Sequence, residues 1–120
     1  AHMEGLPLNH QLLERGGVLK KKTTTSKTYE LYALPGGPPE RPGLVEAAEG
    51  GVEIQVEVWE IISSTVGSFL AGIPKPLGLG SIRLADGSLK LGFICEGIGI
   101  NGARNVSEFG GWRAYLDSKS

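Results

Sequence analysis

The first feature of the chain that could carry chemistry is a histidine at the start of a predicted helix. His10 follows a short loop, residues 5–9, that contains a glycine and a proline. Backbone N–H groups at a helix start have no partner within the helix and lie at the positive end of its dipole, so they suit a carboxylate. The same dipole disfavours an imidazolium, which leaves a neutral ring able to accept or donate a proton near pH 7. His10 is therefore a candidate catalytic residue, and Gly5, Leu6, Pro7 and Asn9 are candidate contacts for the carboxylate of a ligand.

Three further side chains are candidate substrate contacts. His2 is close in sequence to the same loop, and Tyr32 lies in an aromatic-rich strand pattern. Glu96 follows a strand whose alternation points it away from the core, where it would handle ammonia or an ammonium product. Each candidate also has a structural interpretation: His10 and Glu96 as surface residues, His2 as a residue near a chain end, Asn9 as a helix cap and Tyr32 as core.

Composition narrows the remaining chemistry. Arg104 and Arg113 are the other cations considered as receptors for a carboxylate, with ordinary surface ion pairs as the alternative for both. The single cysteine, Cys95, cannot form a disulfide within the chain, and strand alternation assigns it to the interior as an inert thiol. Two histidines and one cysteine do not give the ligand spacing of a zinc site, so we expect no metal and no cofactor.

Charge and hydropathy indicate the surroundings in which the protein works. The formal net charge is -1, and the run Lys20, Lys21 and Lys22 is typical of a solvated loop, so no nucleic-acid partner is expected. No apolar stretch reaches the roughly 18 to 20 residues that cross a bilayer, and the first residues lack the pattern of a signal peptide. We expect a cytoplasmic protein with no membrane partner.

Two short helices are predicted to position these residues. Asn9 is expected to cap a helix over residues 10–16, with Leu8 and Leu13 as a hydrophobic staple and Gly16 or Gly17 at its end. A second helix follows a cap at Ser63 or Ser64. Its apolar face is formed by Val66, Phe69, Leu70 and Ile73.

Strands dominate the rest of the chain. Alternation predicts strands over residues 28–34 and 52–61, and the Pro- and Gly-rich residues 35–43 predict a rigid extended loop. Asp86-Gly87 predicts a two-residue hairpin loop that pairs Leu84 with Leu89 and Ile82 with Leu91, and the second strand continues to Cys95. Near the C-terminal end, the expected core anchors are Trp112, Tyr115 and Leu116.

This order of elements predicts an α+β fold in a single domain over residues 1–120. The sheet is expected to be mostly antiparallel and to close into a small barrel with flanking short helices.

Four segments together resemble a known family: "YELYALPGG…RPGLV", "IQVEVWEI", "LADGSLKLGFICE" and "EFGGWRAYL". In this order they are similar to the C-terminal domain of allophanate hydrolase, of the gamma-glutamylcyclotransferase-like superfamily of small β-barrels. The resemblance covers essentially the whole chain, because "AHMEGLPLNHQL" also fits the opening of that family. It implies a short first strand ending just before Ala1, and it makes residues 1–9 the substrate-binding loop.

The resemblance implies an enzyme domain that acts on N-carboxycarbamate, the unstable product of an amidase step, and promotes its decarboxylation toward ammonia and carbon dioxide. Cyclotransferase activity is disfavoured, because residues 62–80 contain no Asp or Glu where the cyclotransferases carry an acid/base. The signature of an amidase is also missing, so an amidase domain or subunit is the expected partner. Two alternatives stay open: a non-catalytic assembly module, which includes a homo-oligomer, and a paralogue acting on another small carboxylated or amino-acyl compound.

Overall fold

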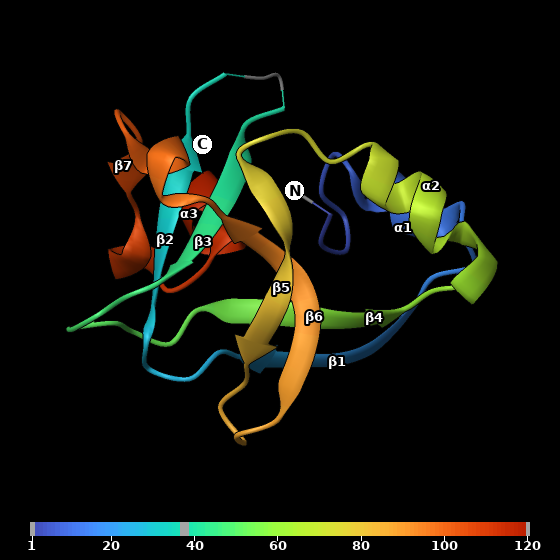
Figure 1. The fold of residues 1–120 in the computed structure, drawn as a ribbon, viewed down its shortest axis with the longest axis horizontal. Coiled ribbons are helices and arrows are strands. Elements are labelled where there is room, and N and C mark those ends of the chain that lie inside the picture. The colour runs from blue at the N-terminus through green and yellow to red at the C-terminus, as the bar shows by residue number, and fades with distance from the viewer. Residues whose placement is uncertain (1, 37–38, 120) are drawn as a thin grey trace.

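Three antiparallel sheets and three short α-helices form the part of the chain that the computed structural model describes, residues 2–36 and 39–119 (Figure 1). The α+β class is therefore confirmed. In chain order the elements are α1 (Asn9–Leu13), β1 (Val18–Thr24), β2 (Tyr29–Leu34), β3 (Arg41–Glu46), β4 (Gln55–Glu60), α2 (Val66–Ala71), β5 (Leu77–Arg83), β6 (Leu89–Cys95), β7 (Arg104–Asn105) and α3 (Trp112–Ser118). Single 3-10 turns lie at Ser63–Thr65, Gly97–Ile100 and Ser107–Phe109.

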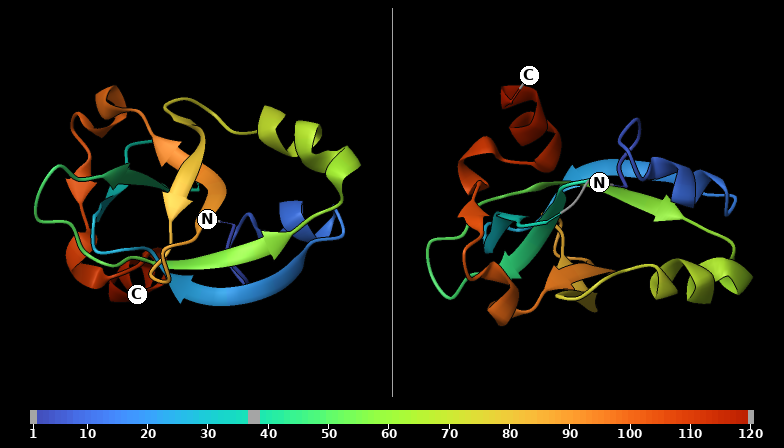
Figure 2. Two further views of the ribbon diagram at one scale, coloured as in Figure 1. Left: turned by 60° about the horizontal axis from the view of Figure 1, so that its bottom comes forward. Right: turned by 90° about the horizontal axis from the view of Figure 1, so that it is seen from above.

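The strands pair as β1 with β4, as β3-β2-β7, and as β5 with β6. Isolated bridges between Thr25 and Leu84, and between Tyr29 and Val52, link these sheets. The described strands do not close into a barrel, because β4 pairs only with β1, and β6 only with β5. Figure 2 shows α1 and α2 near one end of the β1–β4 pair, with α3 beside the three-stranded sheet.

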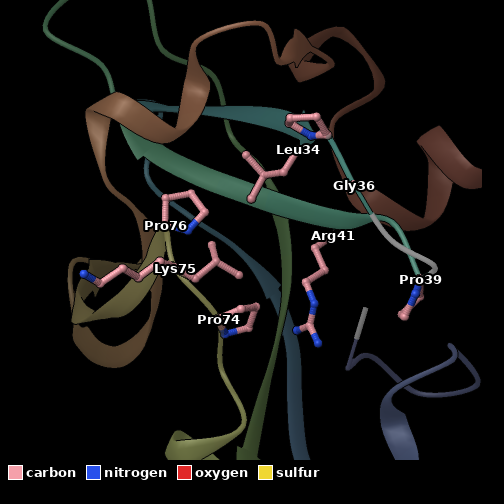
Figure 3. A pocket seen from close by; sticks show the side chains of 9 residues that line it. Leu34, Gly36, Pro39, Arg41, Pro74, Lys75 and Pro76 are labelled. Carbon is pink, nitrogen blue, oxygen red and sulfur yellow. The ribbon is translucent and has the colours of Figure 1, made fainter.

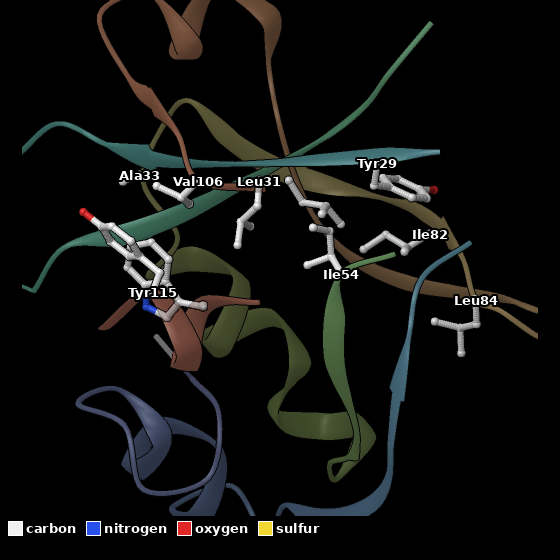
Figure 4. Close-up of a cluster of buried hydrophobic side chains, with 10 residues drawn as sticks. Tyr29, Leu31, Ala33, Ile54, Ile82, Leu84, Val106 and Tyr115 are labelled. Atoms are coloured by element: carbon white, nitrogen blue, oxygen red, sulfur yellow. The ribbon is translucent and has the colours of Figure 1, made fainter. Parts of the chain in front are cut away.

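The core lies between the three-stranded sheet and α3 (Figure 4). Trp112 and Tyr115 are buried there, as predicted, and Leu116 packs against the same cluster. The other buried members come from β2, β3, β5 and nearby loops: Tyr29, Leu31, Ala33, Leu44, Ile54, Ile82, Leu84 and Val106. This packing fixes β2 and β3, and therefore the wall from which Arg41 projects.

Helix α1 is shorter than predicted and begins one residue earlier. Leu8 takes the N-cap position without a side-chain cap, and Asn9 lies inside the first turn. The predicted staple is wrong, because Leu8 is buried whereas Leu13 is exposed. The turn that precedes the helix explains the shift: Asn9 N–H already donates to the Leu6 carbonyl, so helical bonding starts before residue 10.

Two segments predicted as loops are strands. Lys20, Lys21 and Lys22 belong to β1, where their side chains stay exposed on a ladder whose backbone groups pair with β4. The extended loop at 35–43 ends earlier than expected, because β3 starts at Arg41 and contains Pro42. Proline is tolerated there because β3 is an edge strand, so a missing N–H costs no ladder bond on its outer side.

The hairpin between β5 and β6 has a register one residue away from the prediction. Leu89 pairs with Arg83 and Leu91 with Ser81, so Leu91 is 74% exposed instead of sharing the face of Ile82. Two features lengthen the loop. The Asp86 carboxylate accepts hydrogen bonds from Ser88 N–H and hydroxyl, at 2.9 and 2.6 Å, and Gly87 adopts a φ of +87°. None of the helices among the described residues has the length and apolar character needed to cross a membrane.

Candidate active site

An open cavity of about 850 Å³ lies between the β1–β4 pair, α2 and the β5–β6 hairpin. Its walls are mostly apolar. The predicted apolar face of α2 is confirmed and lines this cavity with Val66, Phe69, Leu70 and Ile73. Among the polar residues that line it are His2 from the N-terminal segment, Arg41 from β3 and Glu57 from β4. The others are Lys20, Gln55, Glu60 and Lys90. His2, Arg41 and Glu57 therefore come from three parts of the chain that are distant in sequence.

The His2 ring is held in the cavity wall by one hydrogen bond and two aromatic neighbours. Nε2 lies 2.8 Å from the Gln11 side-chain oxygen, and the ring packs edge-on against Phe69 with a centroid distance of 5.2 Å. Phe93 lies 6.1 Å away on another side. Burial lowers the pKa of His2 below its usual 6.5, the Gln11 contact opposes this, and the nearby positive charge of Arg41 lowers it further.

The contact with Gln11 decides which ring nitrogen of His2 is available for chemistry. An amide oxygen only accepts hydrogen bonds, so Nε2 must carry the proton in this contact. With the pKa lowered, the ring is neutral near pH 7 and Nδ1 carries a lone pair. The backbone at the same residue is also fixed, because the Asn9 side-chain amide donates to the His2 carbonyl at 2.9 Å.

Arg41 supplies a positive charge beside His2. Its side chain lines both the main cavity and a smaller pocket of about 180 Å³, and it extends from β3 while Lys75 points away from it (Figure 3). Within residues 2–36 and 39–119, no carboxylate forms an ion pair with Arg41. An unpaired guanidinium beside a neutral histidine suits a carboxylate ligand.

Glu57 is the buried carboxylate of the site. Its side chain is only 5% exposed, and it accepts three hydrogen bonds: from Glu4 N–H at 2.9 Å, Trp59 Nε1 at 3.0 Å and Arg113 Nη2 at 3.3 Å. The same Arg113 nitrogen donates to the Glu4 carbonyl at 2.8 Å. These donors compensate the cost of burying the charge.

A family model described as "Allophanate hydrolase C-terminal domain" matches residues 1–117 of the chain. The chain belongs to this family. The urea amidolyase of Saccharomyces cerevisiae is 39% identical over 121 residues, which covers 98% of this chain but 7% of that protein. A Kluyveromyces lactis allophanate hydrolase structure superposes with a TM-score of 0.96 at 38% identity, covering 100% of this chain and 20% of that one.

In a third relative the match covers most of the other protein's length. The structure of a uropathogenic E. coli-specific protein is 33% identical with a TM-score of 0.88, and the match covers 97% of this chain and 89% of that one. The allophanate hydrolase C-terminal domain fold therefore occurs both within much longer proteins, of which this chain spans a small part, and in a protein of similar size.

The residues predicted for the substrate loop of this family are only partly brought together. His2 lines the cavity. Asn9 is buried, and its side-chain amide donates to the His2 carbonyl. His10 is exposed outside the cavity, with Nδ1 3.0 Å from the Pro7 carbonyl. The backbone N–H of Leu6 donates to Met3, so this part of the loop is closed on itself, and Gly5 forms the turn with a φ of +77°.

The two strand candidates do not line the cavity. Glu96 is exposed, and neither it nor His10 is among the cavity residues. Tyr32 faces the opposite side of β2 from Leu31, which lines the cavity, and its hydroxyl contacts Glu30 at 3.4 Å. Burial and the Glu30 charge raise the pKa of Tyr32. Cys95 is buried as predicted, and desolvation raises the pKa of its thiol.

Sequence reasoning missed Arg41 and Glu57 for different reasons. Arg41 lies in the Pro- and Gly-rich stretch that was interpreted as loop, so no face could be assigned to it. Glu57 alternates with apolar residues, which is the usual pattern of a solvent-facing position on a strand. The available signal was Trp59, two residues later on the same face, which is large enough to cover a carboxylate and donates to it.

Proposed function

We propose that this domain binds N-carboxycarbamate in the cavity shared by His2 and Arg41 and promotes its decarboxylation. The observation that carries the proposal is the unpaired Arg41 guanidinium on the same cavity as a largely neutral His2. Arg41 would hold one carboxylate of the substrate, and His2 would handle the proton. Membership of the allophanate hydrolase C-terminal domain family supports this substrate class.

The proposed step needs one proton at the substrate nitrogen. The bond from nitrogen to one carboxyl carbon breaks with its electron pair going to nitrogen, the carboxylate leaves as carbon dioxide, and nitrogen takes a proton from Nδ1 of protonated His2. Carbamate remains and, with a further proton, gives ammonia and carbon dioxide. A bound dianion raises the pKa of a neighbouring imidazole, so substrate binding itself would load His2 with the proton that the empty site disfavours.

Two carboxylates line the cavity, and neither lies in residues 62–80, where the cyclotransferases carry their acid/base. Glu57 is buried and accepts hydrogen bonds from Glu4, Trp59 and Arg113, and Glu60 is 73% exposed and lies 3.8 Å from Lys20. This supports the view that the domain, even if it is related to gamma-glutamylcyclotransferases, does not share their reaction.

A strand ahead of Ala1 remains part of the proposal. Such a strand would lead directly into His2, which lines the cavity, and would meet the edges of β4 and β6 that pair with no other described strand. Apolar side chains on it would cover the cavity walls and complete a gamma-glutamylcyclotransferase-like barrel. It would also fix the position of His2 from the N-terminal side.

A second candidate function, subunit or domain assembly, is favoured by three exposed leucines of the β5–β6 hairpin. Leu79, Leu89 and Leu91 are 50, 56 and 74% exposed, lie on paired strands and form part of the wall of the open cavity. Clustered exposed leucines are typical of a surface that a partner covers. The partner would be an amidase domain or a second copy of the chain.

The test of the decarboxylation proposal is the rate of carbon dioxide release after an amidase has acted on allophanate. We expect addition of this chain to accelerate release, His2→Ala to abolish the acceleration and His10→Ala to retain it. The His10 variant also tests the earlier prediction that His10 carries the proton. Equal rates with and without the chain would exclude catalysis and leave the assembly function.

A further inference from the structure

We propose that Glu57 and Arg113 are positioning residues that hold the turn carrying His2 against the cavity. The inference rests on the proposed function for the catalytic meaning of His2. Its geometric part stands on the hydrogen bonds of the described residues alone.

Both polar backbone groups of Glu4 are tied to side chains from other parts of the fold. Its N–H donates to Glu57 on β4 at 2.9 Å, and its carbonyl accepts from Arg113 on α3 at 2.8 Å. Glu57 and Arg113 also pair with each other at 3.3 Å. A single residue is thereby fixed by a strand more than fifty positions away and by the last helix of the chain.

Glu4 is two residues from His2, and the backbone between them belongs to a hydrogen-bonded turn. Met3 to Leu6 form a turn closed by the Leu6 N–H to Met3 carbonyl bond, with the required positive φ at Gly5. His2 is held further by Asn9 at its carbonyl and Gln11 at its ring. The turn is thus attached to α1 and to Glu57 and Arg113. It also has an exposed ion pair, in which Lys22 on β1 donates to the Glu4 carboxylate at 3.3 Å.

The Glu57–Arg113 pair combines a buried carboxylate with a guanidinium side chain that is 41% exposed. A buried charge is not needed for stability alone, since apolar packing serves as well. The Glu57 side chain is 5% exposed, yet its acceptors are directed at Glu4 and Arg113, while its third donor, Trp59, lies on the same strand. This arrangement specifies where the turn lies. Small displacements of a catalytic group reduce the rate by up to about 100-fold, so such an attachment has a catalytic consequence.

The test is Glu57→Gln, with Glu60→Gln as its matched control. Both glutamates lie on β4 and line the cavity, but the Glu60 side chain is 73% exposed and approaches Lys20 at 3.8 Å, not the turn that carries His2. The glutamine keeps the size and one acceptor oxygen at position 57 and presents an amide to Arg113 instead of a carboxylate. Arg113→Gln removes the same attachment from the other side and guards against a folding defect peculiar to one variant.

The first readout is the ring titration of the two histidines by NMR. We expect Glu57→Gln and Arg113→Gln to raise the pKa of His2 toward its ordinary value, because a released turn admits water to the ring. Glu60→Gln should leave it unchanged. The second readout is carbon dioxide release, where we expect kcat to fall about 10- to 100-fold with a smaller change in KM.

The outcomes separate this inference from the proposed function. Lower resistance to urea with an unchanged His2 titration and unchanged kcat would show that the pair is only structural and would overturn the inference. If the wild-type chain fails to accelerate carbon dioxide release, the proposed function fails, while the histidine titration still decides whether Glu57 and Arg113 position His2.

Discussion

Removing the charge of Arg41 is expected to weaken carboxylate binding without weakening the fold. Arg41 begins an edge strand, its side chain is partly buried, and no described carboxylate pairs with it. Arg41→Gln therefore leaves no described carboxylate without its ion-pair partner. We expect the free energy of unfolding to change by no more than about 0.5 kcal/mol, as for other substitutions outside packed or paired sites.

The loss in binding follows from the contact that the ligand would make. A hydrogen bond to a charged group in a protein contributes about 1.5 to 3 kcal/mol. Since 1.4 kcal/mol corresponds to a tenfold change in affinity, Arg41→Gln should raise the Kd of a dicarboxylate about 10- to 150-fold. The lower end applies if water enters the open cavity and screens the contact.

Malonate is a suitable ligand because it replaces the central nitrogen of N-carboxycarbamate with carbon and keeps both carboxylates. Binding is followed by calorimetry and by the NMR signals of His2, with the exposed His10 as internal reference. Arg104→Gln is the matched control, because Arg104 is exposed beside Tyr115, which does not line the cavity. Malonate binding that is equally strong in Arg41→Gln and wild type would refute the assignment of the carboxylate to Arg41.

Three further predictions concern stability. The free energy of unfolding should fall as the pH drops from above 6.5 through the lowered pKa of His2, because the unfolded chain then binds the proton more strongly; urea titrations of His2→Gln should lack this component, and those of His10→Gln should keep it. Thr25→Val should cost about 1 to 3 kcal/mol in urea unfolding, because the buried Ile54 N–H loses its hydroxyl acceptor at 3.0 Å, and a neutral result would contradict this bond. Leu91→Lys should change the unfolding free energy by less than about 0.5 kcal/mol, because its side chain is 74% exposed.

Local periodicity was sufficient for the elements that are buried on one face. The strand at 29–34, the strand core at 55–60 and the apolar face of α2 were predictable because their alternation or helical spacing reflects burial of that face. Segments β1 and β3 were not predictable in this way. β1 has a lysine-rich exposed surface, and β3 tolerates proline because its outer edge is unpaired, so neither shows the pattern of a buried strand.

The hairpin register shows a second limit of local rules. Both possible registers place leucines in cross-strand pairs, and hydrophobic pairing favoured the two-residue loop. The Asp86 side chain decides otherwise, because it accepts two hydrogen bonds from Ser88 and draws that residue into the loop. The two Asp86–Ser88 hydrogen bonds, together with the positive φ of Gly87, thus place Leu89 and Leu91 at exposed positions.

The candidate site was only partly predictable because its chemistry depends on contacts distant in sequence. The two histidines lie eight positions apart and looked equivalent as titratable groups, with His10 favoured by its helix position. Phe69 and Phe93, which come from α2 and β6, bury His2 and so lower its pKa, whereas no such neighbours cover His10 among the described residues. Burial, not helix position, distinguishes them.

The origin of the polar groups in three distant parts of the chain has a consequence for how the domain works. His2 comes from the N-terminal turn, Arg41 from the edge of the three-stranded sheet and Glu57 from the β1–β4 pair. Arg113 on α3 contacts both the Glu4 carbonyl in the N-terminal turn and the Glu57 carboxylate. No single hairpin or helix holds two of the residues His2, Arg41 and Glu57. The proposed site therefore forms only when the separate sheets are packed together. Loss of docking between the sheets should therefore abolish carboxylate binding before the individual ladders unfold, because the ladders are held by their own backbone hydrogen bonds.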